Sequence, residues 1–186
     1  MTTPVLAIEG ISKRFGSTLA NDAVSMTLAR GEIVALLGEN GAGKTTLMSI
    51  LFGHYVPDAG RILIDGAELP PGKPRAAIRA GIGMVHQHFS LAPNLTVLEN
   101  IMTGTERLWS WRSETGAARR KLMDIAERFG LKVDPEARLG DLSVGEQQRV
   151  EILKALYNDA RILILDEPTA VLTNIEAERL FSTLKE

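Results

Sequence analysis

The chain has 186 residues, of which 45% are hydrophobic and 24% charged, so it can bury one substantial core and is typical of a soluble globular domain. Its 21 basic and 23 acidic residues give a net charge of −2, which provides no global field for binding nucleic acid or an anionic membrane. Cysteine is absent, and no apolar run approaches the roughly 20 residues of a membrane span. We expect one cytosolic domain, which would need a partner to associate with a membrane.

Short strand-like runs dominate the first third of the sequence. They cover 5–8, 23–28, 32–37 and 61–64, each bounded by turn-forming residues. The run at 32–37 is apolar after its first residue, as in a strand covered on both faces of a parallel sheet. A helix is expected from Lys44 to about Phe52, ending near Gly53.

The remainder of the chain is predicted to be mainly helical. Helices are expected at 96–102 and 114–129, and Trp109 and Trp111 lie in the loop at 104–113, as loop anchors or partner contacts rather than ligands.

Ser143 is a candidate N-cap of a further helix that runs to about Asn158, because Glu146 stands at the capping-box spacing. A buried strand at 161–166 and an amphipathic helix at 174–185 follow.

Residues 38–45, Gly-Glu-Asn-Gly-Ala-Gly-Lys-Thr, indicate a phosphate-binding loop. They match G-x-x-x-x-G-K-[ST] between a predicted strand and a predicted helix. The glycines let backbone N–H groups turn toward phosphates, and the helix N-terminus favours an anion. Lys44 is expected to bridge the terminal phosphates and Thr45 to bind Mg²⁺. The other residues expected to hold the nucleotide are Gly38, Asn40, Gly41, Gly43 and Thr46. The alternative is a glycine-rich turn that merely contains a lysine.

Asp166 and Glu167 end the apolar run at 162–165. Carboxylates at the C-terminal end of a buried parallel strand stand where open α/β sheets bind ligands. Asp166 is expected to hold Mg²⁺, directly or through water, and Glu167 to orient or deprotonate an attacking water. The alternative is a polar strand terminator without chemistry.

Residues 142–151, Leu-Ser-Val-Gly-Glu-Gln-Gln-Arg-Val-Glu, form the third motif. Together with the phosphate-binding loop and the acidic pair, they resemble the nucleotide-binding domain of ATP-binding cassette (ABC) ATPases over essentially the whole chain. The resemblance implies an α/β fold of the P-loop NTPase type, with a mainly parallel core sheet and an N-terminal antiparallel β subdomain. It also implies a single domain, 1–186, with a helical subdomain at about 88–158. Val144 and Glu146 depart from the family's usual Gly and Gln.

The resemblance assigns further roles. Ser143, Gly145 and Glu146 would close over the γ-phosphate of an ATP held by a second cassette, in a head-to-tail dimer. Gln87 would reach Mg²⁺ or the attacking water, and Phe15 would stack on the adenine. An ordinary core phenylalanine is the alternative for Phe15. His86 and His88 invite a metal interpretation, which two histidines without further ligands disfavour.

Within the family, the sequence is similar to bacterial simple-sugar and nucleoside importer ATPases. Only 99 residues separate Lys44 from Ser143, which leaves no room for the long coiled coil of chromosome-repair members. Thr173 replaces the usual D-loop aspartate, as is common in the importer subgroup. The implied function is ATP hydrolysis that powers solute import at the cytoplasmic face of the membrane, with a permease and, indirectly, a solute-binding protein. The alternative is a ribosome-associated translation factor.

Two further expectations follow from the resemblance. The segment between Gln87 and Ser143 should receive a short helix of the permease. The family's next strand, with its switch histidine, is not found between the signature and Glu186, since His54, His86 and His88 all precede Ser143. We therefore expect this segment by itself to be poorly stable and at most feebly active.

Overall fold

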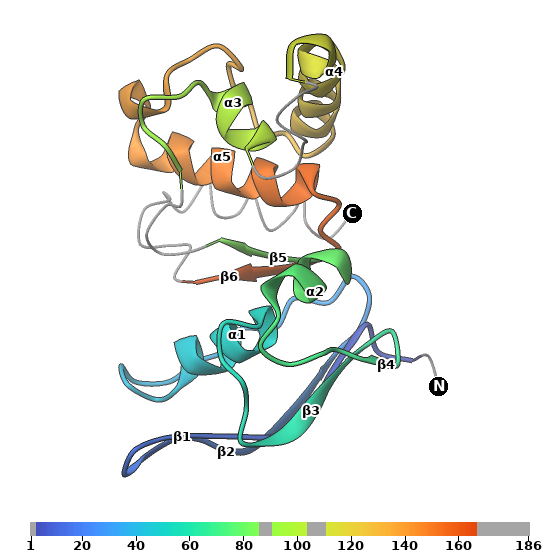
Figure 1. The fold of residues 1–186 in the computed structure, drawn as a ribbon, viewed down its shortest axis with the longest axis vertical. Coiled ribbons are helices and arrows are strands. Elements are labelled where there is room, and N and C mark those ends of the chain that lie inside the picture. Colours follow the sequence, from blue (N-terminus) through green and yellow to red (C-terminus); the bar gives the residue numbers. More distant parts are fainter. Residues whose placement is uncertain (1–2, 86–90, 104–110, 167–186) are drawn as a thin grey trace. The chain divides into compact units, whose positions relative to one another are not determined.

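The computed structural model describes residues 3–85, 91–103 and 111–166 (Figure 1). The chain forms two compact units that divide between Ile82 and Gly83. The predicted helix at 174–185 and Trp109 lie outside the described residues. The loop predicted at 104–113 is wrong at its end, because Trp111 is the first residue of a helix. No helix among the described residues combines the length and the apolar content that a membrane crossing requires.

A four-stranded antiparallel sheet of order β2-β1-β3-β4 organises the first unit. Its strands are β1 (Leu6–Phe15), β2 (Thr18–Leu28), β3 (Ala59–Ile64) and β4 (Ala67–Glu68). The runs predicted at 5–8, 23–28 and 61–64 are confirmed, but β1 and β2 extend further and meet in a hairpin that pairs Phe15 with Thr18. Strand β1 therefore continues to Phe15, well past the apolar residues at 5–8 from which it was predicted.

Two helices complete the first unit. Helix α1 (Lys44–Phe52) has the predicted bounds and ends at Gly53, whose left-handed conformation lets its N–H group bond back to Ile50. Helix α2 (Pro74–Arg79) was not predicted, although Pro74 stands at its first turn, where a missing N–H group costs nothing. The buried side chains of this unit include Ile8, Ile11, Leu47, Ile50, Leu51, Ile62 and Ala77.

The prediction of a strand at 32–37 is wrong for the described structure. Residues 32–39 have no regular secondary structure, and no strand among the described residues pairs with them. Ile33, Val34 and Leu36 are exposed, and Leu37 is 91% exposed. An apolar run shows that the residues favour burial, but a strand also needs a neighbouring strand that forms hydrogen bonds with its N–H and C=O groups.

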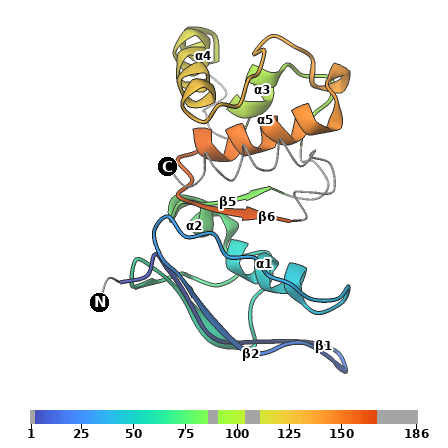
Figure 2. The ribbon, with the colours of Figure 1, turned by 180° about the vertical axis from the view of Figure 1, so that it is seen from behind.

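The second unit is mainly helical. Helix α5 (Val144–Tyr157) lies between a two-stranded sheet and helices α3 (Val97–Met102) and α4 (Trp111–Arg128), as Figures 1 and 2 show from opposite sides. The sheet consists of β5 (Ile82–Val85), which was not predicted, and β6 (Ile162–Leu165), which confirms the run at 161–166. The core of this unit includes Val85, Val97, Ile101, Leu122, Leu139, Val150, Ile152 and Leu153.

Candidate functional site

The N-terminus of α1 is built to receive an anion. Gly43, in the left-handed conformation (φ 83°), precedes the helix, and no side chain caps its exposed N–H groups. Its first turn contains no acidic residue, whereas α3 and α5 both begin with a capping box and a glutamate. Free N–H groups and an unopposed helix dipole give this end of α1 a positive potential.

Lys44 adds a full positive charge to the same place. Its ammonium group donates hydrogen bonds to the carbonyl oxygens of Gly38 (2.6 Å) and Glu39 (2.9 Å), so the side chain folds back over the loop that precedes α1. Thr45, the next residue, is exposed on the first turn of the helix. The loop of residues 38–43 therefore encloses a cation beside unbonded helix N–H groups, an arrangement that suits the phosphates of a nucleotide.

Strand β2 contacts the last residue of this loop, a contact that the sequence did not predict. The Asn21 amide nitrogen donates to the carbonyl oxygen of Gly43 (3.2 Å), and this side chain is only 6% exposed. Its amide oxygen is buried and has no hydrogen-bond partner among the described residues. The sequence shows no local pattern for this contact, because Asn21 and Gly43 are 22 residues apart.

Phe15 lies at the end of β1 and is 44% exposed. Its ring meets that of Tyr55 edge to face, with 5.3 Å between ring centroids and 72° between ring planes. The alternative that Phe15 is a core residue is therefore disfavoured, because the described core side chains are almost fully covered. No spacing in the sequence pointed to Tyr55, which is 40 residues away.

The signature residues cap α5 as predicted. The Ser143 hydroxyl accepts from the N–H group of Glu146 (3.4 Å) and donates to its carboxylate (2.7 Å), which also accepts from the Ser143 N–H group (2.9 Å). These hydrogen bonds from Ser143 hold the pKa of the Glu146 carboxyl below its ordinary value, with a smaller contribution from the charge of Arg149. A negative charge thus occupies the helix N-terminus that the resemblance assigns to a phosphate.

Hydrogen bonds hold the turn that precedes Ser143 in place. A single helical turn, Leu139–Asp141, precedes it, and the Gln147 side chain donates to the carbonyl oxygens of Leu139 (3.4 Å) and Leu142 (3.0 Å). The N–H groups of Leu139 and Gly140 bond to the segment 93–95, just after Gln87 and its neighbours. The turn before the signature is therefore fixed to the segment that leads into α3.

Asn100 holds that leading segment in place. It is 2% exposed, its oxygen accepts from the N–H group of Ala92 (2.7 Å), and its nitrogen donates to the carbonyl oxygens of Ala92 and Thr96 (both 3.0 Å). No pattern in the sequence marks this residue, because its partners are backbone groups four and eight positions away.

Asp166 follows β6, and its N–H group donates to the carbonyl oxygen of Val85 at the end of β5 (3.2 Å). The carboxyl ends of the two strands therefore adjoin, and Asp166 stands at the strand end where it was expected. Glu167 and Gln87 lie outside the described residues. Of the predicted residues, the phosphate-binding loop and Phe15 belong to the first unit, and the signature and Asp166 to the second.

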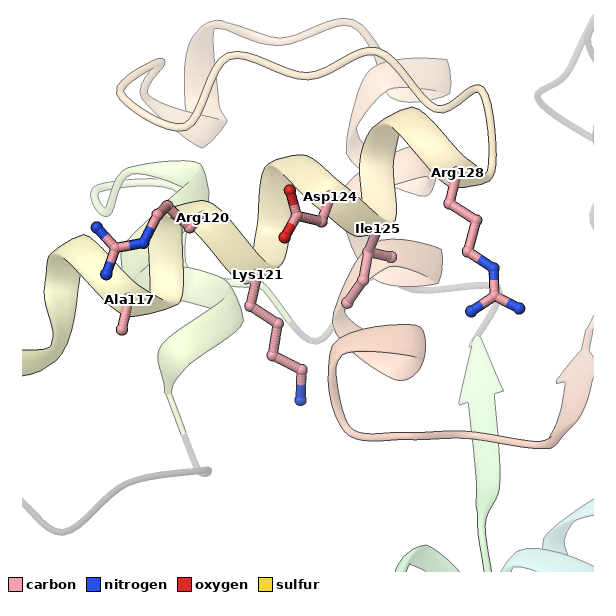
Figure 3. Close-up of a pocket in the computed structure, with 6 residues that line it drawn as sticks. All are labelled: Ala117, Arg120, Lys121, Asp124, Ile125 and Arg128. Atoms are coloured by element: carbon pink, nitrogen blue, oxygen red, sulfur yellow. The ribbon is translucent and has the colours of Figure 1, made fainter.

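A hollow of about 400 Å³ along α4 contains none of these residues. Figure 3 shows its lining, which comes from successive turns of the helix: Ala117, Arg120, Lys121, Asp124, Ile125 and Arg128. The Lys121 ammonium group donates to the carbonyl oxygen of Tyr157 (2.7 Å), so it joins α4 to the end of α5. The hollow is open to solvent and four of its six lining residues are charged, whereas small-molecule sites enclose their ligand and carry few polar groups.

The motifs and their geometry agree with a comparison against known families, in which the ABC transporter family matches residues 21–170. The chain belongs to the ABC transporter family. Its fold is the α/β ABC cassette with an N-terminal antiparallel sheet, as in the crystal structure of an ATP-binding cassette of an ABC transporter in its ADP conformation. That structure is 27% identical with a TM-score of 0.83, over 99% of this chain and 76% of the other.

Among curated proteins, this ABC cassette is similar to ATP-binding proteins of import systems. The glucose import ATP-binding protein TsgD13 of Haloferax volcanii is 46% identical over 98% of this chain, and the guanosine import ATP-binding protein NupO of Bacillus subtilis is 49% identical over 97%. The chain spans 38% and 36% of the length of these two relatives.

Proposed function

We propose that this chain is an ATP-binding and ATP-hydrolysing cassette that powers the import of a sugar or nucleoside through a membrane permease. The observation that carries the proposal is the uncapped N-terminus of α1, where Lys44 folds back over the preceding loop. Similarity to a glucose importer and a guanosine importer supports import over the ribosome-associated alternative. The permease and the solute-binding protein would select the solute, because the cassette would act on ATP alone.

The phosphates of ATP would lie against Lys44 and the N–H groups of the loop and of α1. The other residues that would hold the nucleotide are Gly38, Asn40, Gly41 and Gly43 in the loop and Thr46 in α1. Phe15 would stack on the adenine. The donor set suits Mg²⁺, because the Thr45 hydroxyl and the Asp166 carboxylate offer the hard oxygen ligands that this ion prefers. When bound, Mg²⁺ would neutralise charge on the phosphates. Glu167 would orient or deprotonate the water that attacks the γ-phosphate, and Gln87 would assist at the same place.

A second cassette is part of the proposal. Ser143, Gly145 and Glu146 would contact the γ-phosphate of an ATP bound to that cassette, in a head-to-tail dimer whose two cassettes belong to the same full-length polypeptide. The segment between Gln87 and Ser143 would meet the permease at the cytoplasmic face of the membrane. The helical subdomain is proposed to cover about 88–158 of the single cassette.

Two variants of the full-length protein test the proposal. Lys44→Ala removes the cation from the loop, so MgATP affinity should fall at least tenfold. Glu167→Gln keeps the shape of the site without the base, so MgATP should still bind while steady-state hydrolysis falls by about 100-fold or more.

Lys132→Ala serves as the control, because Lys132 is exposed and lies in the second unit. Unchanged MgATP affinity in Lys44→Ala would exclude the phosphate site. Hydrolysis at the unaltered rate in Glu167→Gln would exclude this carboxylate as the base.

A further inference from the structure

The loop that joins α1 to β3 is fixed to the end of β1. The Asp58 N–H group donates to the carbonyl oxygen of Ser12 (2.8 Å), and its carboxylate accepts from the N–H group of Arg14 (2.7 Å) and the ammonium group of Lys13 (3.0 Å). The hydrogen bonds from Arg14 and Lys13 hold the pKa of Asp58 below its usual value, so the carboxylate is charged at neutral pH. Three contacts therefore tie one residue of the loop to three consecutive residues of β1.

The same loop places Tyr55. Its N–H group donates to the carbonyl oxygen of Ser49 in α1 (3.3 Å), just after Gly53 ends the helix. Tyr55 is thus held toward α1 at one end of the loop and toward β1 at the other, through Asp58. Since α1 begins with Lys44, a single clamped loop connects the phosphate-binding helix to the strand that carries Phe15.

Held in this way, the Tyr55 ring meets the Phe15 ring edge to face at 5.3 Å, and the Lys13 ammonium nitrogen lies 5.4 Å from the centroid of the Phe15 ring. Phe15 is the last residue of β1, and the two-residue turn at 16–17 joins it to β2 at the tip of the hairpin. Phe15 and Tyr55 are both more than two-fifths exposed, so burial of apolar surface explains the pair poorly. Edge-to-face geometry restrains a ring that the hairpin tip alone would leave free to change rotamer.

We propose that Tyr55 is a positioning residue of the base-binding site: it holds Phe15 in the orientation in which the phenyl face stacks on adenine. The inference rests on the proposed function, because Phe15 acts there as the stacking surface. A ring that is already ordered loses less side-chain entropy when the base binds, so Tyr55 contributes to affinity without contacting the nucleotide. Lys13 and Asp58 belong to the same device because they fix the loop that carries Tyr55.

The test uses the full-length protein and two probes, MgATP and magnesium tripolyphosphate, which has the phosphates but no base. Tyr55→Leu should weaken MgATP binding about three- to tenfold, the range of an aromatic pair, and leave tripolyphosphate binding unchanged. Phe15→Leu should weaken MgATP binding about five- to a hundredfold, the range of base stacking, again without effect on tripolyphosphate. The double variant should bind MgATP as Phe15→Leu does, because Tyr55 acts through Phe15.

Tyr55→Phe keeps the ring and loses only the hydroxyl, so it should restore MgATP affinity. Unaltered MgATP binding in Tyr55→Leu beside weakened binding in Phe15→Leu would overturn the inference and leave the proposed function standing. An equal loss for tripolyphosphate in Tyr55→Leu would overturn it too, since the residue would then act on the phosphate site. If Phe15→Leu binds MgATP normally, the base site itself is wrongly assigned.

Discussion

Replacing Gly43 with alanine separates two physical requirements of the phosphate-binding loop. Gly43 has a φ of 83°, a left-handed conformation that costs an alanine about 1–2 kcal/mol. An added Cβ would also lie 2.1 Å from the carbonyl oxygen of Ala20 and 2.9 Å from the Asn21 amide nitrogen. The first contact joins two backbone-fixed atoms, so no side-chain rotation relieves it, and the loop or β2 has to move.

Gly41 provides the matched control. It has nearly the same φ, 86°, but an added Cβ would meet nothing within 4 Å. Gly41→Ala should therefore cost only the conformational term of about 1–2 kcal/mol, whereas Gly43→Ala adds an overpacking term of about 1–3 kcal/mol. The expected total for Gly43→Ala is about 2–5 kcal/mol.

Urea unfolding of the nucleotide-free full-length protein, followed by circular dichroism, measures both variants, and the quantity of interest is the difference in their free energies of unfolding. Working without nucleotide keeps any loss of phosphate binding out of the comparison. Equal unfolding free energies for Gly41→Ala and Gly43→Ala would refute the close approach of β2 to the loop. They would also remove the reason for assigning Asn21 to the support of Gly43.

Two further predictions concern the second unit. Ser143→Ala should destabilise α5 by about 1 kcal/mol near neutral pH. The pKa of the Glu146 carboxyl is lowered in the folded protein, so the stability that this carboxylate contributes is present above its usual pKa of 4.5 and is lost as the pH falls further. The unfolding midpoint should therefore decline less toward acid pH in Ser143→Ala than in the unaltered protein. An identical decline in the two proteins would contradict the capping box. Asn100→Ala leaves the Ala92 N–H group without its partner and removes the side chain that joins Ala92 to Thr96, so the segment before α3 is held less firmly. Hydrogen exchange of the Val97 and Leu98 amides should therefore accelerate about 100-fold, whereas the exposed Asn94→Ala should not change it. Equal exchange in both asparagine variants would contradict the role of Asn100.

The features that the sequence predicted well are those that neighbouring residues determine. The capping box of α5 needs only Ser143 and Glu146, three positions apart, and the bounds of α1 follow from Lys44 after a glycine-rich loop and from Gly53 at its end. Asp166 was placed correctly because an apolar run followed by an acid marks a strand end. In each case the physical cause lies within a few residues, where a sequence pattern displays it.

The features that escaped prediction depend on partners far along the chain. Asn21 supports Gly43 across 22 residues, and Tyr55 meets Phe15 across 40, so neither contact leaves a local pattern. Strand β5 (Ile82–Val85) was missed because Gly83 interrupts its apolar residues, whereas β6, of the same length, is a continuous apolar run. These long-range contacts join β2 to Gly43 and the loop after α1 to the end of β1, so the motif residues alone do not reveal them.

The segment 32–37 shows the same division between local pattern and distant partner. Its apolar residues predicted a strand covered on both faces, yet no described strand pairs with it and Leu37 is almost fully exposed. Burying four such side chains would be favourable by about 1.5–3 kcal/mol each, but only when another strand also accepts and donates the backbone hydrogen bonds. The hydrophobic pattern therefore indicates how much free energy burial would contribute, and the presence of a partner strand decides whether the strand forms.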